Sequence, residues 1–149
     1  MKRLLFTGSF DPFTTGHADI ASRAATMAEE VIIAVGFNET KTEALASAIC
    51  RVDEINAWAR RQNLYPRVKA MQMPGAAAAF ASSHGCEAII RGVRNSADFL
   101  YEYNMACLNR KISGIETILL PTDPSLSYVS SSAVREMRHF GIDTTEFIP

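Results

Sequence analysis

The chain has 149 residues, 48% of them hydrophobic, a length and composition that suit one domain with a single well-packed core. Fifteen Lys and Arg against sixteen Asp and Glu give a formal net charge of -1. No global positive field is available to hold a nucleic-acid backbone or an anionic membrane, so we expect neither partner and look for a locally built anion site.

The cysteines and the N-terminus indicate a cellular compartment. Cys50, Cys86 and Cys107 are odd in number and widely spaced, which suits neither a disulfide framework nor a metal knuckle. The N-terminal apolar run stops at Thr-Gly-Ser before it could form a signal peptide, and no run approaches the roughly 20 apolar residues of a membrane span. The expectation is a cytoplasmic protein with reduced thiols.

Strands and helices are predicted to alternate in the first half of the chain. A short apolar strand at 4–7 leads through a loop into a helix whose buried face runs to Met27 and Ala28. Residues 31–37 are nearly continuously apolar and β-branched, which is typical of a strand covered on both faces. Periodic apolar residues at 45–59 predict a second helix, and 68–73 predicts a third strand.

The alternation continues in the second half. A helix at 75–84 capped by Gly85, a strand at 88–90, a helix at 97–112, a strand at 117–120 and a last helix opening at Ser130 complete the pattern. The fold class is therefore α/β, with residues 1–149 forming a single Rossmann-like domain: a doubly wound, parallel, five-stranded sheet with helices on both faces. Ligands of such sheets bind at the carboxyl ends of the strands.

The loop after the first strand reads Gly-Ser-Phe-Asp-Pro-Phe-Thr-Thr-Gly-His over residues 8–17. Gly8 allows the backbone to approach a ligand closely, and His17 stands at a helix start, where backbone amides favour an anion. An imidazole N–H at this place can stabilise charge that grows on phosphate oxygens. A histidine near a helix start is more often structural, so the neighbouring loops decide between the two readings.

The loops after the second and fifth strands also offer groups that suit phosphates. Lys41 follows the second strand, and Ser130, Ser131 and Ser132 follow the fifth with hydroxyls and free helix amides. Considered by itself, Lys41 is best explained as a solvated loop residue, and the serines as an ordinary helix cap.

Two arginines follow the fourth strand, on either side of a glycine. The planar guanidinium groups of Arg91 and Arg94 suit phosphate oxygens, although surface pairs with Asp98 or Glu102 are the slightly preferred explanation when the arginines are considered alone. Four of five strands are thus followed by a phosphate-suited group, and the fold brings all four to one edge of the sheet. This convergence favours a site that acts on phosphates.

Together these motifs make the chain resemble the phosphopantetheine adenylyltransferase family, which makes dephospho-coenzyme A from ATP and 4′-phosphopantetheine. The resemblance runs essentially end to end. It rests on Gly-Ser-Phe-Asp-Pro with Thr-Thr-Gly-His, on Arg-Gly-Val-Arg followed by Ala-Asp-Phe-Leu-Tyr-Glu, and on Tyr-Val-Ser-Ser-Ser. The first motif marks the wider nucleotidyltransferase superfamily, and the other two narrow it to this family.

The resemblance implies a reversible, direct in-line attack of the acceptor phosphate on ATP, without a covalent enzyme intermediate. It implies that His17 stabilises the transition state and that Lys41 and Arg91 act on the acceptor phosphate. ATP would contact Ser9, Phe10, His17, Gly92, Val93, Arg94, Glu102, Leu126, Ser127, Tyr128, Val129, Ser130, Ser131 and Ser132. The acceptor would contact Ser9, Lys41, Ala77, Arg91 and Asn109.

The resemblance also implies Mg²⁺ accompanying ATP, no metal site made of protein ligands, a homohexamer and inhibition by coenzyme A. Three features depart from the family pattern: Thr7 stands where proline is usual, Leu100 replaces a common acidic residue, and no Glu-Glu-Arg precedes Val52. The chain ends at Pro149, where many relatives continue into another helix, so we expect a C-terminal extension to be absent or removed.

Three other readings compete with this one. A nucleotidyltransferase acting on nicotinate mononucleotide or glycerol 3-phosphate would share the Gly-His loop. A nucleotide-binding regulatory module would use the same sheet edge without needing His17 or Lys41. A fragment of a class I aminoacyl-tRNA synthetase is disfavoured by the short chain and by the lack of a lysine-serine signature loop.

Overall fold

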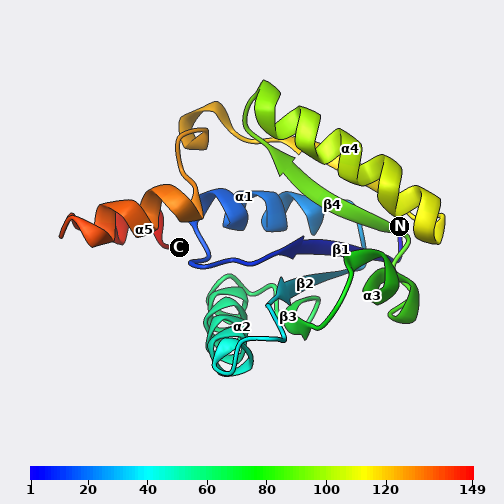
Figure 1. The fold of residues 1–149 in the computed structure, drawn as a ribbon, viewed down its shortest axis with the longest axis horizontal. Coiled ribbons are helices and arrows are strands. Elements are labelled where there is room, and N and C mark those ends of the chain that lie inside the picture. The colour runs from blue at the N-terminus through cyan, green and yellow to red at the C-terminus, as the bar shows by residue number, and fades with distance from the viewer.

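A computed structural model describes all residues, 1–149, as one β-sheet with helices on both of its faces (Figure 1). The α-helices are α1 (Thr15–Ala24), α2 (Ala44–Arg61), α3 (Ala77–Ser83), α4 (Ser96–Ser113) and α5 (Ser131–His139). The strands are β1 (Arg3–Gly8), β2 (Glu30–Gly36), β3 (Val68–Met73), β4 (Ala88–Val93) and β5 (Glu116–Pro121). Two short 3-10 helices, Pro124–Leu126 and Thr145–Phe147, were not predicted from the sequence.

The five strands are all parallel, in the order β3-β2-β1-β4-β5, which confirms the predicted fold class. The chain builds outward from β1 in one direction and then returns to β4 on its other side. The connections leaving β1 and β4 therefore diverge, and parallel α/β sheets bind ligands in the crevice that opens at such a point. Figure 1 shows α5 extending beyond this carboxyl end of the sheet.

Alternate residues of β1 face opposite sides of the sheet, as the two-residue period of a strand requires. Leu4 and Phe6 join the larger apolar cluster, which includes buried residues of α1 and α2. Leu5 joins a smaller cluster on the other face, with Phe80 of α3. The predicted covering of both faces is thus confirmed, and the central strand is buried almost throughout.

Two predicted boundaries were wrong in ways that matter for the site. Helix α1 ends at Ala24, because the chain tightens into a turn in which the amide and hydroxyl of Thr26 both donate to the Arg23 carbonyl. Strand β4 continues past the apolar run to Val93, since Arg91 remains paired in register with Leu119 of β5. Arg91 therefore lies in the strand and not in the loop after it.

Helix α4 and strand β5 leave apolar side chains exposed or only partly covered. Glu102 is the one buried residue among the 18 of α4, while Leu100, Tyr103 and Ile112 are each more than half exposed. Strand β5 lies at the edge of the sheet and is half-buried along Thr117–Leu120. No helix in the structure combines the length and the apolarity that crossing a membrane requires.

Candidate active site

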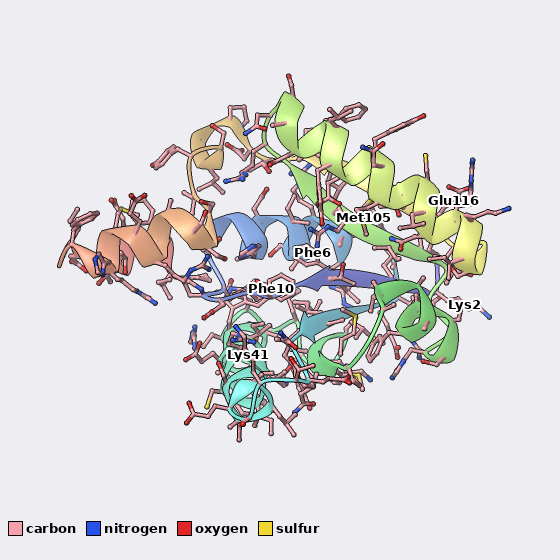
Figure 2. The ribbon with its side chains drawn as sticks, viewed as in Figure 1. Lys2, Phe6, Phe10, Lys41, Met105 and Glu116 are labelled. Atoms are coloured by element: carbon pink, nitrogen blue, oxygen red, sulfur yellow. The ribbon has the colours of Figure 1, made fainter.

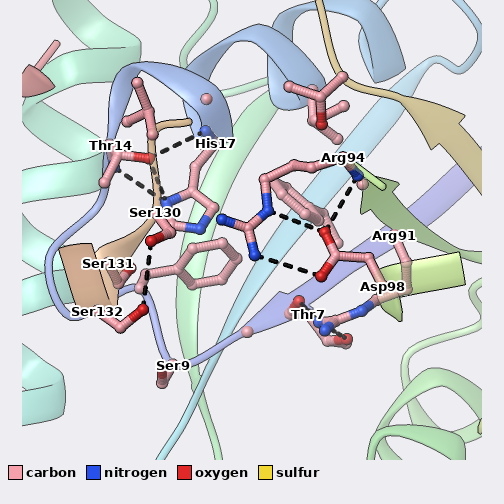
Figure 3. A pocket seen from close by; sticks show the side chains of 18 of the residues that line it. Thr7, Ser9, Thr14, His17, Arg91, Arg94, Asp98, Ser130, Ser131 and Ser132 are labelled. Atoms are coloured by element: carbon pink, nitrogen blue, oxygen red, sulfur yellow. Dashed lines mark hydrogen bonds and ion pairs between the residues drawn. The ribbon is translucent and has the colours of Figure 1, made fainter. Parts of the chain in front are cut away.

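A pocket of about 350 Å³ opens at the carboxyl ends of β1 and β4 (Figure 3). Many of the residues predicted for the site line it, namely Ser9, Phe10, His17, Arg91, Gly92, Arg94, Glu102, Val129, Ser130, Ser131 and Ser132. They come from four separate segments of the chain: the β1–α1 loop with the first turn of α1, the end of β4 with the residue after it, α4, and residues 129–132 at the start of α5. The topology therefore assembles one polar site from distant parts of the sequence.

Other predicted residues lie outside the lining of this pocket. Lys41 is in the exposed segment between β2 and α2, on the α2 side of the sheet (Figure 2). Ala77 begins α3, and Asn109 lies in the second half of α4. The remaining four, Val93, Leu126, Ser127 and Tyr128, flank lining residues in sequence without lining the pocket themselves.

His17 is fixed by a reciprocal cap at the start of α1. The backbone N–H of Thr14 donates to His17 Nδ1 at 3.0 Å, and the Thr14 hydroxyl accepts from the His17 amide at 3.4 Å. Since Nδ1 accepts, the proton of the neutral ring resides on Nε2. The cap that stabilises the helix thereby also sets the tautomer and presents an N–H donor to the pocket.

The surroundings of His17 keep its ring neutral. Phe10 packs edge-on against the ring and Phe13 stacks on it, with centroid distances of 5.0 and 5.7 Å. Burial, assisted by the positive charges of Arg91 and Arg94, lowers the pKa of His17 to about 4. At neutral pH the imidazole is thus an uncharged donor.

The Gly8-Ser9-Phe10 turn leaves little room for a side chain at the glycine. Phe10 is 2% exposed and adopts a φ of 49°, a left-handed backbone that brings its ring back over Gly8. A Cβ on Gly8 would lie 3.1 Å from that ring. The turn thus buries the Phe10 side chain against His17 and leaves Ser9 lining the pocket.

Arg91 lies between β1 and α4. Its Nε and Nη2 donate to the Glu102 carboxylate at 2.7–3.0 Å, and its Nη1 donates to the Thr7 carbonyl and, at 3.3 Å, lies within reach of the Thr7 hydroxyl. Glu102 is 6% exposed while the Arg91 side chain is 30% exposed, so this is a partly buried pair and not the surface pair that the sequence suggested. Arg91 thus pairs with Glu102 and lines the pocket at the same time.

Arg94 makes the second pair, with Asp98 one turn into α4. Its Nε lies 2.8 Å from Asp98 Oδ2, and the Arg94 amide donates to the same oxygen at 3.1 Å. These hydrogen bonds lower the pKa of Asp98. Figure 3 shows the Arg94 guanidinium projecting from Asp98 into the pocket, toward the side that carries His17.

The start of α5 closes the pocket and adds a cation that the sequence reasoning missed. Ser130 caps the helix by accepting from the Ala133 amide at 3.1 Å, and Ser131 donates to the Pro12 carbonyl at 2.8 Å. Arg135 lines the pocket and donates to the Asp11 carbonyl at 2.6 Å. Its position one turn after Ser131 places it on the same helix face, a spacing that the sequence shows but that does not by itself distinguish it from a solvated arginine.

The polar groups of the pocket are suited to binding phosphates. No group of three or more His, Cys, Asp or Glu side chains in the structure could hold a metal ion. Both carboxylates of the pocket, Asp98 and Glu102, already face arginines. A neutral N–H donor, arginines and helix-start amides around one crevice favour binding and charge stabilisation of phosphate groups.

Comparisons with known proteins agree with this chemistry. A family model described as Cytidylyltransferase-like matches residues 5–137. A phosphopantetheine adenylyltransferase of Porphyromonas gingivalis is 46% identical over 145 residues, covering 97% of this chain and 92% of the relative. Proteins of the same name from Phocaeicola vulgatus and Oenococcus oeni are 42% and 36% identical, each match covering the whole chain and 96% and 92% of the relative.

A solved structure supports the fold independently. A Vibrio parahaemolyticus protein, provisionally named a nicotinate-nucleotide adenylyltransferase, superposes with a TM-score of 0.64 over 99% of this chain and 94% of that one, at 13% identity. Identity this low shows the shared fold and nothing finer. The near full-length relatives at 36–46% identity decide the family, and the chain belongs to the phosphopantetheine adenylyltransferases of the cytidylyltransferase-like group.

Proposed function

We propose that this protein transfers the adenylyl group of ATP to 4′-phosphopantetheine, giving dephospho-coenzyme A and pyrophosphate in a reversible step of coenzyme A biosynthesis. The observation that carries the proposal is the hydrogen bond from the Thr14 amide to His17 Nδ1, which leaves the Nε2–H of the neutral ring available to a ligand in the pocket. The named relatives supply the acceptor, because the pocket chemistry alone suits any phosphorylated one.

The proposed mechanism is a direct displacement. A phosphate oxygen of the acceptor attacks the α-phosphorus of ATP, the bond to the bridging oxygen breaks, and pyrophosphate leaves with that oxygen. His17 donates its Nε2–H to an α-phosphate oxygen as charge builds there. A ring that presents an N–H has no free lone pair toward the pocket, which supports a donor role over a general base for a serine nucleophile.

The arginines and serines position the reactants. Arg94 and Arg135 are placed to bind the triphosphate together with the hydroxyls and amides from Ser130 to Ser132. Arg91 binds the acceptor phosphate, which Lys41 reaches from the segment between β2 and α2. Holding both phosphates in line supplies much of the rate enhancement in such transfers.

Magnesium enters with ATP in this proposal. The pocket carboxylates are engaged with arginines, so the ion is held by the phosphate oxygens of the nucleotide and not by a protein cage. When bound it neutralises charge on the triphosphate. The three unpaired cysteines support a reducing compartment, and we assign the reaction to the cytoplasm.

A homohexamer is the assembly we propose. The exposed apolar side chains of α4 and the half-buried edge strand β5 form a surface that further copies of the chain would cover. We also propose that coenzyme A inhibits, because it contains the whole dephospho-coenzyme A product and would compete for its site.

The test is a pyrophosphate-release assay of the purified protein with ATP and Mg²⁺. The expected result is release with 4′-phosphopantetheine, and none with nicotinate mononucleotide or glycerol 3-phosphate run in parallel. Release with another acceptor would keep the mechanism and overturn the acceptor. If no pyrophosphate is released with any of the three acceptors, although the protein still binds ATP, the result would favour a nucleotide-binding module.

A further inference from the structure

Arg91 is held on two sides, and its donors are nearly all in use. A guanidinium has five N–H groups. The Nε–H and one Nη2–H bond to Glu102, and the two Nη1–H groups face the carbonyl and the hydroxyl of Thr7. Only the second N–H of Nη2 therefore remains for a ligand.

The two partners come from elements that the sequence alone does not bring together. Thr7 is the next-to-last residue of β1 and is 6% exposed, while Glu102 is the one buried residue of α4. Thr7 and Arg91 both point to the face of the sheet that α3 and α4 cover, by the same alternation that places Leu5 and Ile89 there. The guanidinium is thus pinned between a strand and a helix.

We propose that Thr7 and Glu102 are positioning residues that hold Arg91 in one orientation, so that its remaining N–H and its charge meet the phosphate of the acceptor. Neither needs to touch the ligand for this role. The inference rests on the proposed function, in which Arg91 binds that phosphate, and it gives Glu102 a task other than the ATP contact that the family resemblance implies.

The Thr7 hydroxyl can be removed without changing side-chain shape. Thr7→Val leaves the carbonyl bond and the Glu102 pair intact and removes the 3.3 Å contact of Nη1, which loosens the guanidinium without releasing it. We expect the dissociation constant for the phosphorylated acceptor to rise about threefold to tenfold, the scale of one ordinary net hydrogen bond, and that for unphosphorylated pantetheine to stay unchanged. Thr7→Ser keeps the hydroxyl and should restore most of the affinity.

Thr117→Val is the matched control, because the Thr117 hydroxyl is also buried in a strand but has no hydrogen-bond partner. For Glu102 the variant is Glu102→Gln, since Glu102→Ala would remove the one buried residue of α4 and could undock the helix. We expect affinity for the phosphorylated acceptor to fall at least tenfold, because an amide nitrogen would replace one of the two oxygens that face the guanidinium.

The decisive experiment is a double-mutant cycle by isothermal titration calorimetry with wild type, Thr7→Val, Arg91→Ala and the double variant. If Thr7 acts through Arg91, Thr7→Val has no further effect in the Arg91→Ala background. Losses that multiply, or an equal loss for pantetheine, would overturn the inference while leaving the proposed function intact. Arg91→Ala with unchanged affinity for both ligands would instead overturn the role of Arg91 in the proposed function, and the inference with it.

Discussion

The amide of Thr14 donates to His17 Nδ1 at 3.0 Å, and that one contact joins helix capping to the chemistry of the pocket. The same geometry predicts what loss of the ring does. His17→Ala should leave the affinity for ATP nearly unchanged and lower kcat by roughly 100- to 1,000-fold, the scale of removing one donor that acts on transition-state charge.

The measurements are steady-state kinetics and calorimetric titration of ATP in the same preparation. His139→Ala, at the far end of α5, is the control for removal of a histidine outside the pocket. A fall in ATP affinity that matches the fall in kcat would show a ground-state role, which contradicts the assignment.

The lowered pKa of His17 predicts how folding stability depends on pH. Between pH 6.5 and about 4 the unfolded chain protonates this histidine and the folded protein does not, so the free energy of unfolding falls as the pH drops through that window. The contribution from His17 is at most about 3 kcal/mol. Above pH 6.5 neither state is protonated there, and the histidine adds no pH dependence.

Urea unfolding of wild type and His17→Gln at pH 7 and pH 4.5 isolates this contribution. The wild type should lose about 2 kcal/mol more than the variant between the two pH values. Equal losses in both proteins would mean that His17 titrates normally in the folded state.

Lys41 is exposed, and its proposed partner is the phosphate of the acceptor. Lys41→Ala should therefore weaken binding of the phosphorylated acceptor about tenfold or more, measured by calorimetric titration, while changing the weak binding of pantetheine little. Lys2→Ala removes an exposed lysine just before β1, at the amino end of the strand and outside the pocket lining, and serves as the control. If both ligands lose affinity alike, the lysine contacts another part of the acceptor.

The exposed face of α4 predicts the effect of a charge on assembly. Ile112 is 63% exposed in the single chain, and Ile112→Glu should lower the molar mass measured by sedimentation or light scattering, because a buried unpaired carboxylate is costly. Tyr65→Glu, at the turn between α2 and β3, replaces another exposed large side chain, one that lies under Arg60, with the same charge and should leave the molar mass unchanged. An unchanged assembly in Ile112→Glu would exclude this end of α4 from the interface.

The sequence predicted the helices and strands correctly where the local apolar pattern agrees with the strand pairing in the sheet. Residues 68–73 have the same bounds in the prediction and in the structure, and Gly85 follows α3 with the positive φ that a cap requires. It was insufficient at β4, where Arg91 becomes part of the strand through pairing with Leu119, a contact that apolar periodicity cannot reveal.

In the candidate active site, too, locally determined features were predictable and features that depend on distant contacts were not. The histidine loop was predictable because its capping pattern is local, within four residues. The bond between Arg91 and Thr7 joins residues 84 positions apart and could not be read from spacing. Arg135 was missed because a single arginine in an amphipathic helix resembles any solvated one until the helix is seen to start at the pocket.

The pairing of Arg91 with Glu102 and of Arg94 with Asp98 has a consequence for the kinetics of encounter. Two of the arginines of the pocket have their charge cancelled before any nucleotide arrives, and the chain as a whole carries a formal charge of -1. Long-range attraction of ATP is therefore small, and its association rate should vary little with ionic strength. Selection of the nucleotide takes place at contact, when phosphate oxygens compete with Asp98 for the guanidinium of Arg94.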